Sequence, residues 1–147
     1  MPTTGAPGNI WYPDANSPVA PLENLFLQLA DSVNVAIAAI DTKLADTGWV
    51  NLATSNGWSG VGSDVPQIRK IGKIVYLTGI VENGTAQTVL FIPSGSRTSR
   101  TMRLSVLDFA TGNNVYISLF TDGAIQVSSS SPTTRKPSFS GISYVSA

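Results

Sequence analysis

The side chains that most often carry chemistry in enzymes are missing from this sequence. It contains no histidine and no cysteine, which removes the usual general base, the Ser-His-Asp and Cys-His nucleophile systems and the commonest metal ligands. Carboxylates remain, and residues 47–147 contain only four: Asp64, Glu82, Asp108 and Asp122. A glycosidase needs two carboxyl groups facing one another across a cleft, and Asp122 stands in a turn motif that explains it without catalysis. We therefore predict no catalytic residue and no enzyme activity.

Motifs for bound cofactors and metals are also missing. The glycine-rich segment 57–62 lacks the Lys-Ser/Thr ending of a phosphate-binding loop and has no parallel βαβ unit around it. No window holds the dense set of oxygen ligands that calcium requires. The sequence predicts no metal site and no cofactor.

One polar loop has residue types that suit ligand recognition. Segment 93–100 is rich in serine and contains Arg97 and Arg100, and Arg103 follows nearby. These arginines can hold an anionic or sugar ligand; the alternative is a solvated loop whose charges keep it soluble. Three aromatic residues could stack on sugar rings, although burial in strands is their commoner fate: Trp58, Tyr116 and Tyr144.

The composition is that of about one domain with few charges. Of the 147 residues, 42% are hydrophobic and 12% are charged, against about 25% charged residues in typical soluble domains. That deficit suggests surface covered by contacts between chains. The eight bases of residues 47–147 are dispersed, so we predict no nucleic-acid partner, which would need a clustered basic stripe.

The sequence also indicates where the protein is made. The N-terminal residues lack the basic and apolar regions of a signal peptide. We expect no stretch of about 18 apolar residues, the length that a membrane helix needs. A protein made in the cytoplasm, with no membrane partner, is the prediction.

Residues 1–20 predict an extended arm, because four prolines and two glycines interrupt regular structure. Within the arm stand Ile10, Trp11 and Tyr12. They either pack on the chain's own helix or β domain, or dock on another protein. An arm with apolar side chains and few internal hydrogen bonds suits the second role, and we predict an anchor.

Residues 21–46 carry the one strong helix pattern. Pro21 suits the first turn, where its missing N–H is not needed, and Asp46-Thr47-Gly48 provides a stop. Apolar residues recur between them at intervals of three and four, the spacing of a coiled-coil seam. The predicted interface residues are Leu22, Phe26, Leu29, Val33, Ala36, Ile37 and Ile40. Either this face lies against the chain's own β domain or, as we predict, identical helices pack in a parallel bundle.

Residues 47–147 predict a β domain of about seven short strands separated by Gly, Pro and Ser, which is typical of an antiparallel sandwich or barrel. Asn83-Gly84, between residues 74–82 and 87–92, predicts a hairpin. Asp122-Gly123, between residues 115–120 and 124–127, predicts a second one. The predicted fold class is mainly β, with an extended arm (1–20), one oligomerisation helix (21–46) and an antiparallel β-sandwich head (47–147).

Part of the sequence resembles the head domains of bacteriophage tail-fibre and minor tail proteins. The resembling residues are Trp49-Val50-Asn51-Leu52, Asn56-Gly57-Trp58 and Pro66-Gln67-Ile68-Arg69-Lys70-Ile71-Gly72-Lys73-Ile74-Val75-Tyr76-Leu77-Thr78-Gly79. The arm and the helix are similar to the N-termini of small tail proteins from phages of actinobacteria. These motifs describe a junction between a helix and a β head; they do not describe a chemistry.

The resemblance implies a homotrimeric virion protein, with helices bundled on the threefold axis and β heads that bind host-surface saccharide. Residues 1–20 would then attach the trimer to other virion proteins. A first alternative is a structural decoration protein of the capsid or tail, held through its arm. A second is a cell-wall depolymerase, which the missing histidine and the sparse acids disfavour.

Overall fold

The computed structural model describes residues 22–129 and 132–147 of the chain. The chain divides into two compact units, Met1–Leu44 and Ala45–Ala147. The predicted arm of residues 1–20, with Ile10, Trp11 and Tyr12, lies outside the described residues.

Helix α1 spans Leu22–Lys43. It ends where Leu44 makes the last helical hydrogen bond, from its N–H to the Ile40 carbonyl at 2.9 Å. Gly48 then takes a φ of 65°, a left-handed conformation that glycine adopts at little cost. The predicted stop at residues 46–48 therefore lies just beyond the end of the helix.

The segment Asn24–Lys43 of α1 has the length and the mean hydropathy, 1.3, of a helix that could cross a membrane. The expectation that no stretch is apolar enough is wrong by this criterion. The window average hides the periodic placement of polar residues, since Gln28, Asp31 and Asn34 recur along one side of the helix.

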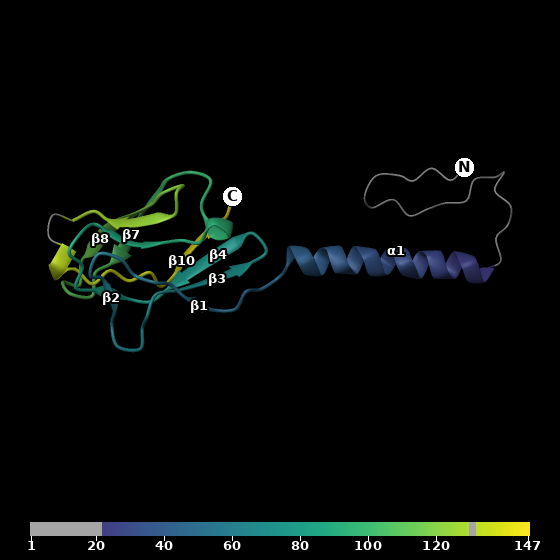
Figure 1. Ribbon diagram of the computed structural model, residues 1–147, viewed down its shortest axis with the longest axis horizontal. Helices are drawn as coiled ribbons and strands as arrows, with labels where there is room; N and C mark the ends of the chain where they lie inside the picture. The colour runs from purple at the N-terminus through teal and green to yellow at the C-terminus, as the bar shows by residue number, and fades with distance from the viewer. Residues whose placement is uncertain (1–21, 130–131) are drawn as a thin grey trace. The chain divides into compact units, whose positions relative to one another are not determined.

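The unit Ala45–Ala147 is built of antiparallel sheets (Figure 1). The first sheet has the order β1 (Val50–Asn51), β3 (Gln67–Ile71), β4 (Ile74–Thr78) and β10 (Ile142–Val145). The second sheet has the order β6 (Thr88–Phe91), β9 (Ala124–Val127), β8 (Asn114–Leu119) and β7 (Met102–Leu107). A two-stranded ribbon pairs β2 (Ser59–Gly60) with β5 (Val81–Glu82), and two short 3-10 helices are η1 (Ser94–Ser96) and η2 (Pro132–Thr134). The prediction of a mainly β chain with one N-terminal helix and an antiparallel sandwich is confirmed.

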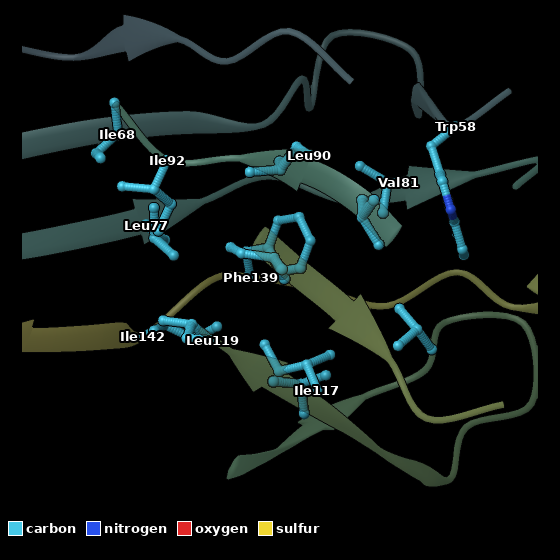
Figure 2. Close-up of a cluster of buried hydrophobic side chains, with 14 of the residues drawn as sticks. Trp58, Ile68, Leu77, Val81, Leu90, Ile92, Ile117, Leu119, Phe139 and Ile142 are labelled. Atoms are coloured by element: carbon cyan, nitrogen blue, oxygen red, sulfur yellow. The ribbon is translucent and has the colours of Figure 1, made fainter. Parts of the chain in front are cut away.

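The core lies between the two four-stranded sheets. Alternation along β8 places every second residue inward, and the inward set is buried: Val115, Ile117 and Leu119. Leu77 of the first sheet and Leu90 of the second join the same cluster. Figure 2 shows Phe139, which is 1% exposed, at the centre of these side chains. The two sheets are therefore held together as a sandwich by one continuous apolar layer.

One of the two predicted hairpins is present. β8 and β9 pair on either side of Asp122-Gly123, with Leu119 opposite Ile125. Gly123 has a φ of 94°, and the Asp122 carboxylate accepts a hydrogen bond from the Ala124 N–H at 2.9 Å. The prediction that Asp122 serves the turn geometry is confirmed.

The hairpin predicted at Asn83-Gly84 is wrong. β4 pairs with β3 and β10, β5 pairs with β2, and β6 pairs with β9, so the strands beside Asn83-Gly84 do not pair with each other. Gly84 instead lies against the buried ring of Trp58, where an added Cβ would come within 1.9 Å of a ring carbon. The glycine is needed for the close approach of an indole ring and not for a hairpin turn.

Candidate functional site

The predicted interface residues of α1 are exposed along the whole described helix. Phe26 is 63% exposed, and Leu29, Val33, Ile37 and Ile40 are between 46% and 54% exposed. Ala36 is exposed as well, and the side chain of Leu22 lies outside what the structure describes. Taken by itself, helix α1 thus leaves its apolar seam uncovered.

The three candidate arginines have different surroundings. Arg97 is partly buried, and its Nε donates to the carbonyl of Ile92 at 3.2 Å, so it supports its own loop. Arg100 is exposed, and its carbonyl accepts a hydrogen bond from the Thr98 hydroxyl at 2.8 Å. Arg103 lies on β7, outside the loop. Of the three, Arg100 and Arg103 keep exposed side chains that a ligand could reach.

The three candidate aromatic residues differ in how far they are buried. Trp58 is buried and donates from Nε1 to the Ala86 carbonyl at 2.8 Å. Tyr144 is buried too; its hydroxyl donates to the Ser96 carbonyl at 2.7 Å, and burial raises its pKa. Tyr116 is 54% exposed on β8, with the guanidinium of Arg103 5.0 Å from its ring centre. Only Tyr116 of this set can meet a ligand, and one side of its ring already faces a cation.

A groove between two strand edges was not predicted from the sequence. β7 and β10 stand at the ends of their sheets, and a groove of about 710 Å³ runs between them. Ser105 of β7 and Ser143 of β10 are among its lining residues. Edge strands carry backbone N–H and C=O groups that no further strand satisfies.

The backbone of β7 shows which groups face the groove. The Leu107 carbonyl accepts from the Ser138 N–H at 2.9 Å on the side away from β8, whereas the Asp108 N–H bonds toward the β8 side. Backbone groups of a strand point alternately to its two sides. The N–H and C=O groups of Arg103 and Ser105 therefore point to the free edge.

The same alternation applies to β10. The Ser146 N–H donates to the Lys73 carbonyl at 2.8 Å, on the β4 side, and the Ala147 N–H donates to the Arg97 carbonyl at 2.8 Å, on the opposite side. The backbone groups of Ser143 share the direction of those of Ala147. Both walls of the groove thus offer main-chain donors and acceptors.

Hydroxyl groups and one carboxylate line the same groove. The polar lining residues are Asp64, Thr78, Ser105, Ser138, Ser140 and Ser143. Among them, the hydroxyls of Thr78 and Ser140 are 3.2 Å apart, and the Ser138 hydroxyl accepts from the Ser140 N–H at 3.2 Å. Phe109, 56% exposed, adds an aromatic ring to the lining.

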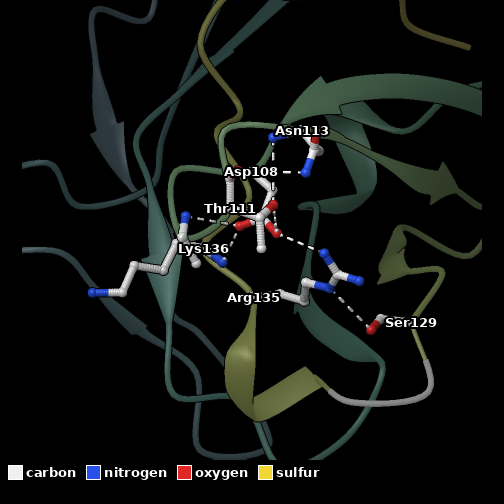
Figure 3. Close-up of polar contacts among 7 residues, drawn as sticks. Asp108, Thr111, Asn113, Ser129, Arg135 and Lys136 are labelled. Atoms are coloured by element: carbon white, nitrogen blue, oxygen red, sulfur yellow. Dashed lines mark hydrogen bonds and ion pairs between the residues drawn. The ribbon is translucent and has the colours of Figure 1, made fainter.

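A buried carboxylate fixes the backbone next to Phe109 (Figure 3). Asp108 is fully buried and accepts four hydrogen bonds: from the Ala110 N–H at 3.0 Å, the Thr111 hydroxyl at 3.0 Å, the Lys136 N–H at 2.8 Å and Arg135 Nη1 at 2.9 Å. Burial opposes ionisation of this carboxyl, but the hydrogen bonds, first that of Arg135, outweigh it and hold the pKa of Asp108 below its ordinary value. We call this arrangement the Asp108 clamp.

The clamp joins two segments that are far apart in the sequence. Next to the clamp, the Phe109 N–H donates a hydrogen bond to the Lys136 carbonyl at 2.9 Å, which links the same two segments. A second ion pair, Lys136 to Glu82 at 2.5 Å, ties the same segment to β5. The end of the groove that holds Phe109 and Ser138 is therefore built on a fixed backbone.

These groups can bind a polar ligand by hydrogen bonds and by stacking. Asp64 is the one carboxylate in the groove lining, so the groove itself offers no pair of facing carboxyl groups. No cluster of three or more metal-binding side chains occurs in the part of the chain that the structure describes. The site has the residue types of a recognition surface.

Taken together, the helix and the sandwich define a β head that follows an N-terminal helix with an exposed apolar face. No protein-family model matches the sequence, and no curated protein sequence matches it either. Among solved structures, the chain is similar to the receptor binding protein (gp15) of Listeria phage PSA, with a TM-score of 0.67 and 20% sequence identity.

That likeness covers 87% of this chain and 81% of the phage protein. The unit Ala45–Ala147 alone is a smaller share of the chain than 87%. The match must therefore extend beyond this unit into the first 44 residues. At this identity the likeness establishes a shared fold.

Proposed function

We propose that this protein is a non-catalytic component of a phage virion, a homotrimer whose β heads bind saccharide on the surface of the host cell. The observation that carries the proposal is the fold shared with a phage receptor binding protein over most of both chains. The exposed polar groove on the head supplies the kind of surface that recognition needs.

The apolar face of α1 supports the trimer. Each large side chain of the seam that a partner helix covers stabilises the assembly by roughly 1.5–3 kcal/mol. The lost freedom of the associating chains offsets much of this gain, so the head must contribute contacts as well. Ile74 and Val145, which are 45% and 62% exposed and lie opposite one another in the first sheet, are suited to that contribution.

A bilayer is a less suitable partner for α1 than copies of the same helix. The helix contains Asp31 and Asp41, and a charged residue near the centre of a membrane helix costs about 2.5–3.5 kcal/mol. In a bundle, by contrast, the side of the helix that carries Asp31 stays in water. The pattern favours a helix that is apolar on one face over one that is apolar all round.

A trimer would bind through avidity. Three weak saccharide sites on one particle act together, because binding of the first head raises the effective concentration of the other two at the cell surface. No single head then needs a tight site.

The proposal is tested by incubating the fluorescently labelled full chain with a panel of Listeria and actinobacterial strains. We expect saturable binding to the intact cells of at least one strain, with no release of soluble glycan. Binding to no strain, with the protein found on virions by antibody labelling, would instead identify a decoration protein. Release of glycan from cell walls would identify a depolymerase.

A further inference from the structure

We propose that the groove between β7 and β10 is the saccharide site of the head, and that it takes an uncharged sugar and not an anionic wall polymer. This inference rests on the proposed function, because it says where and what the head binds. It depends on three features of the groove: its hydrogen-bonding groups, its aromatic ring and its charge.

The hydrogen-bonding groups match the hydroxyls of a sugar. Five hydroxyl side chains line the groove, and each can both donate and accept. The edge backbone of Ser105 and Ser143 adds main-chain donors and acceptors that point into the same space. A sugar ring carries several hydroxyl groups that also donate and accept, so the polar groups of both the sugar and the groove can find hydrogen-bond partners.

The aromatic ring provides an apolar contact beside the polar ones. Phe109 lines the groove with 56% of its surface exposed, and an aromatic face can cover the C–H side of a pyranose ring. Its backbone is held between Asp108 and the Lys136 carbonyl. A ring on a fixed backbone loses little conformational freedom when a ligand binds.

The charge of the groove selects the class of sugar. Asp64 is the one charged residue in the lining, and no lysine or arginine is among the lining residues. A phosphate-bearing wall polymer would meet a carboxylate without any compensating cation. An uncharged saccharide meets no such repulsion, and the Asp64 carboxylate accepts hydrogen bonds from its hydroxyls.

The groove also has a suitable size. Its volume of about 710 Å³ lies within the range of roughly 300–1,000 Å³ that is typical of small-molecule sites. A branch or terminal unit of a cell-surface glycan is therefore the occupant that fits.

The test uses the full chain with two kinds of probe, observed by saturation-transfer NMR. The first kind is a set of methyl glycosides of glucose, galactose, rhamnose and N-acetylglucosamine, and the second is poly(glycerol phosphate). Two variants alter the groove: Phe109→Ala removes the ring, and Ser143→Tyr fills the space beside β10. Each has a matched control outside the groove, namely Phe91→Ala, at a phenylalanine that is 53% exposed on β6, and Ser128→Tyr, at an exposed serine.

We expect at least one methyl glycoside to bind, and both groove variants to weaken this binding on the order of tenfold, while both controls bind as the unaltered chain does. Ser143→Tyr keeps the test decisive if Phe109→Ala folds poorly. Sugar binding that survives both groove variants overturns the assignment of the site. Binding of poly(glycerol phosphate) alone, reduced by Arg100→Ala or Arg103→Ala, overturns the assignment of an uncharged ligand.

Adsorption to cells separates this inference from the proposed function. If the unaltered chain and both groove variants bind cells equally, the receptor-binding role stands and the groove is not the site. If the unaltered chain binds neither a cell nor a sugar, the proposed function and this inference both fail.

Discussion

The carboxylate of Asp108 joins two segments of the head, because its partners lie in the turn that follows β7 and in the segment that contains Arg135 and Lys136. A buried acceptor of this kind stabilises a fold only while all its donors are in place. Sequence reasoning could place Asp108 after an apolar strand, but it could not predict the clamp. Two of the four donors, Arg135 and Lys136, lie more than 25 positions away, and no local pattern indicates that they meet Asp108.

We expect Asp108→Asn to lower the free energy of unfolding by about 1–3 kcal/mol at neutral pH, because the amide cannot accept all four hydrogen bonds and loses the charge that Arg135 faces. Urea unfolding of the full chain measures this loss. Asp122→Asn is the control: its side-chain oxygen can still accept from the Ala124 N–H, so its unfolding should change little. Equal stability of the two variants would contradict the role of the clamp.

The lowered pKa of Asp108 predicts how the stability of the protein depends on pH. The pKa of Asp108 is lower in the folded protein than the ordinary value of 3.8, so the clamp contributes its full stability above that value and loses it as the pH falls through the folded pKa. The difference in unfolding free energy between the unaltered chain and Asp108→Asn should therefore be constant above about pH 5 and shrink in stronger acid. A difference that grows toward low pH would reverse the sign and refute the argument.

A second carboxylate can be followed directly by NMR titration. Asp46 forms an ion pair with Arg69 at 2.5 Å, and the hydrogen bonds from Arg69 and from the Gly48 N–H lower its pKa to about 2. In Arg69→Ala the pKa of Asp46 should rise toward 3.8. Arg100→Ala, at another exposed arginine, should leave it unchanged. An Asp46 that titrates identically in both variants would show that the pair is absent in solution.

At the scale of the strands, the buried position of the Trp58 ring depends on the absence of a side chain at Gly84. An added Cβ at Gly84 would lie 1.9 Å from a carbon of that ring, whereas nothing lies within 4 Å of an added Cβ at Gly95. Gly84→Ala should destabilise the head by about 1–3 kcal/mol or more, because the indole must leave its buried position. Gly95→Ala should have little effect. Thermal unfolding, followed by tryptophan fluorescence, measures both, and equal melting temperatures would show that the Trp58 contact is not tight.

The two turn dipeptides show how far local sequence determines this fold. Asp122-Gly123 lies between strands that pair with each other, so its turn chemistry and the tertiary structure agree. At Asn83-Gly84 the local conformation is also turn-like, since Asn83 has a φ of 65°. However, Gly79 ends β4 before the turn, and an added Cβ there would lie 2.4 Å from the Val65 carbonyl. Turn chemistry predicts a bend of the chain, but long-range packing decides which strands pair.

The groove could not be predicted from the sequence for a related reason. Ser105 and Ser143 look like solvent-facing strand residues, and their shared groove exists only because β7 and β10 end neighbouring sheets. The arginine loop, by contrast, was visible as a cluster in the sequence. Part of that cluster is used within the protein itself, since Arg97 bonds to the Ile92 carbonyl.

For the whole molecule, the face of α1 that carries Val33 determines the predicted assembly. Val33→Asp, alone or with Phe26→Asp, should convert the trimer to a monomer, because it places a charge in the centre of an apolar seam. Val35→Asp is the matched control, since Val35 is 71% exposed and lies outside the seam. Multi-angle light scattering at micromolar concentration should give three times the chain mass for the unaltered protein and for Val35→Asp, and the single-chain mass for Val33→Asp.

The contrast between these two valines also separates a helical bundle from a membrane span. In a bilayer every face of a helix meets apolar surroundings, so an aspartate at position 33 or at position 35 would be unfavourable by a similar amount, about 2.5–3.5 kcal/mol. In a bundle only position 33 is covered. If the unaltered protein co-sediments with lipid vesicles, and if both substitutions abolish this binding equally, α1 is a membrane helix. A difference between the two variants in mass, with no binding to vesicles, would assign it to copies of itself, and the heads would then be presented three at a time.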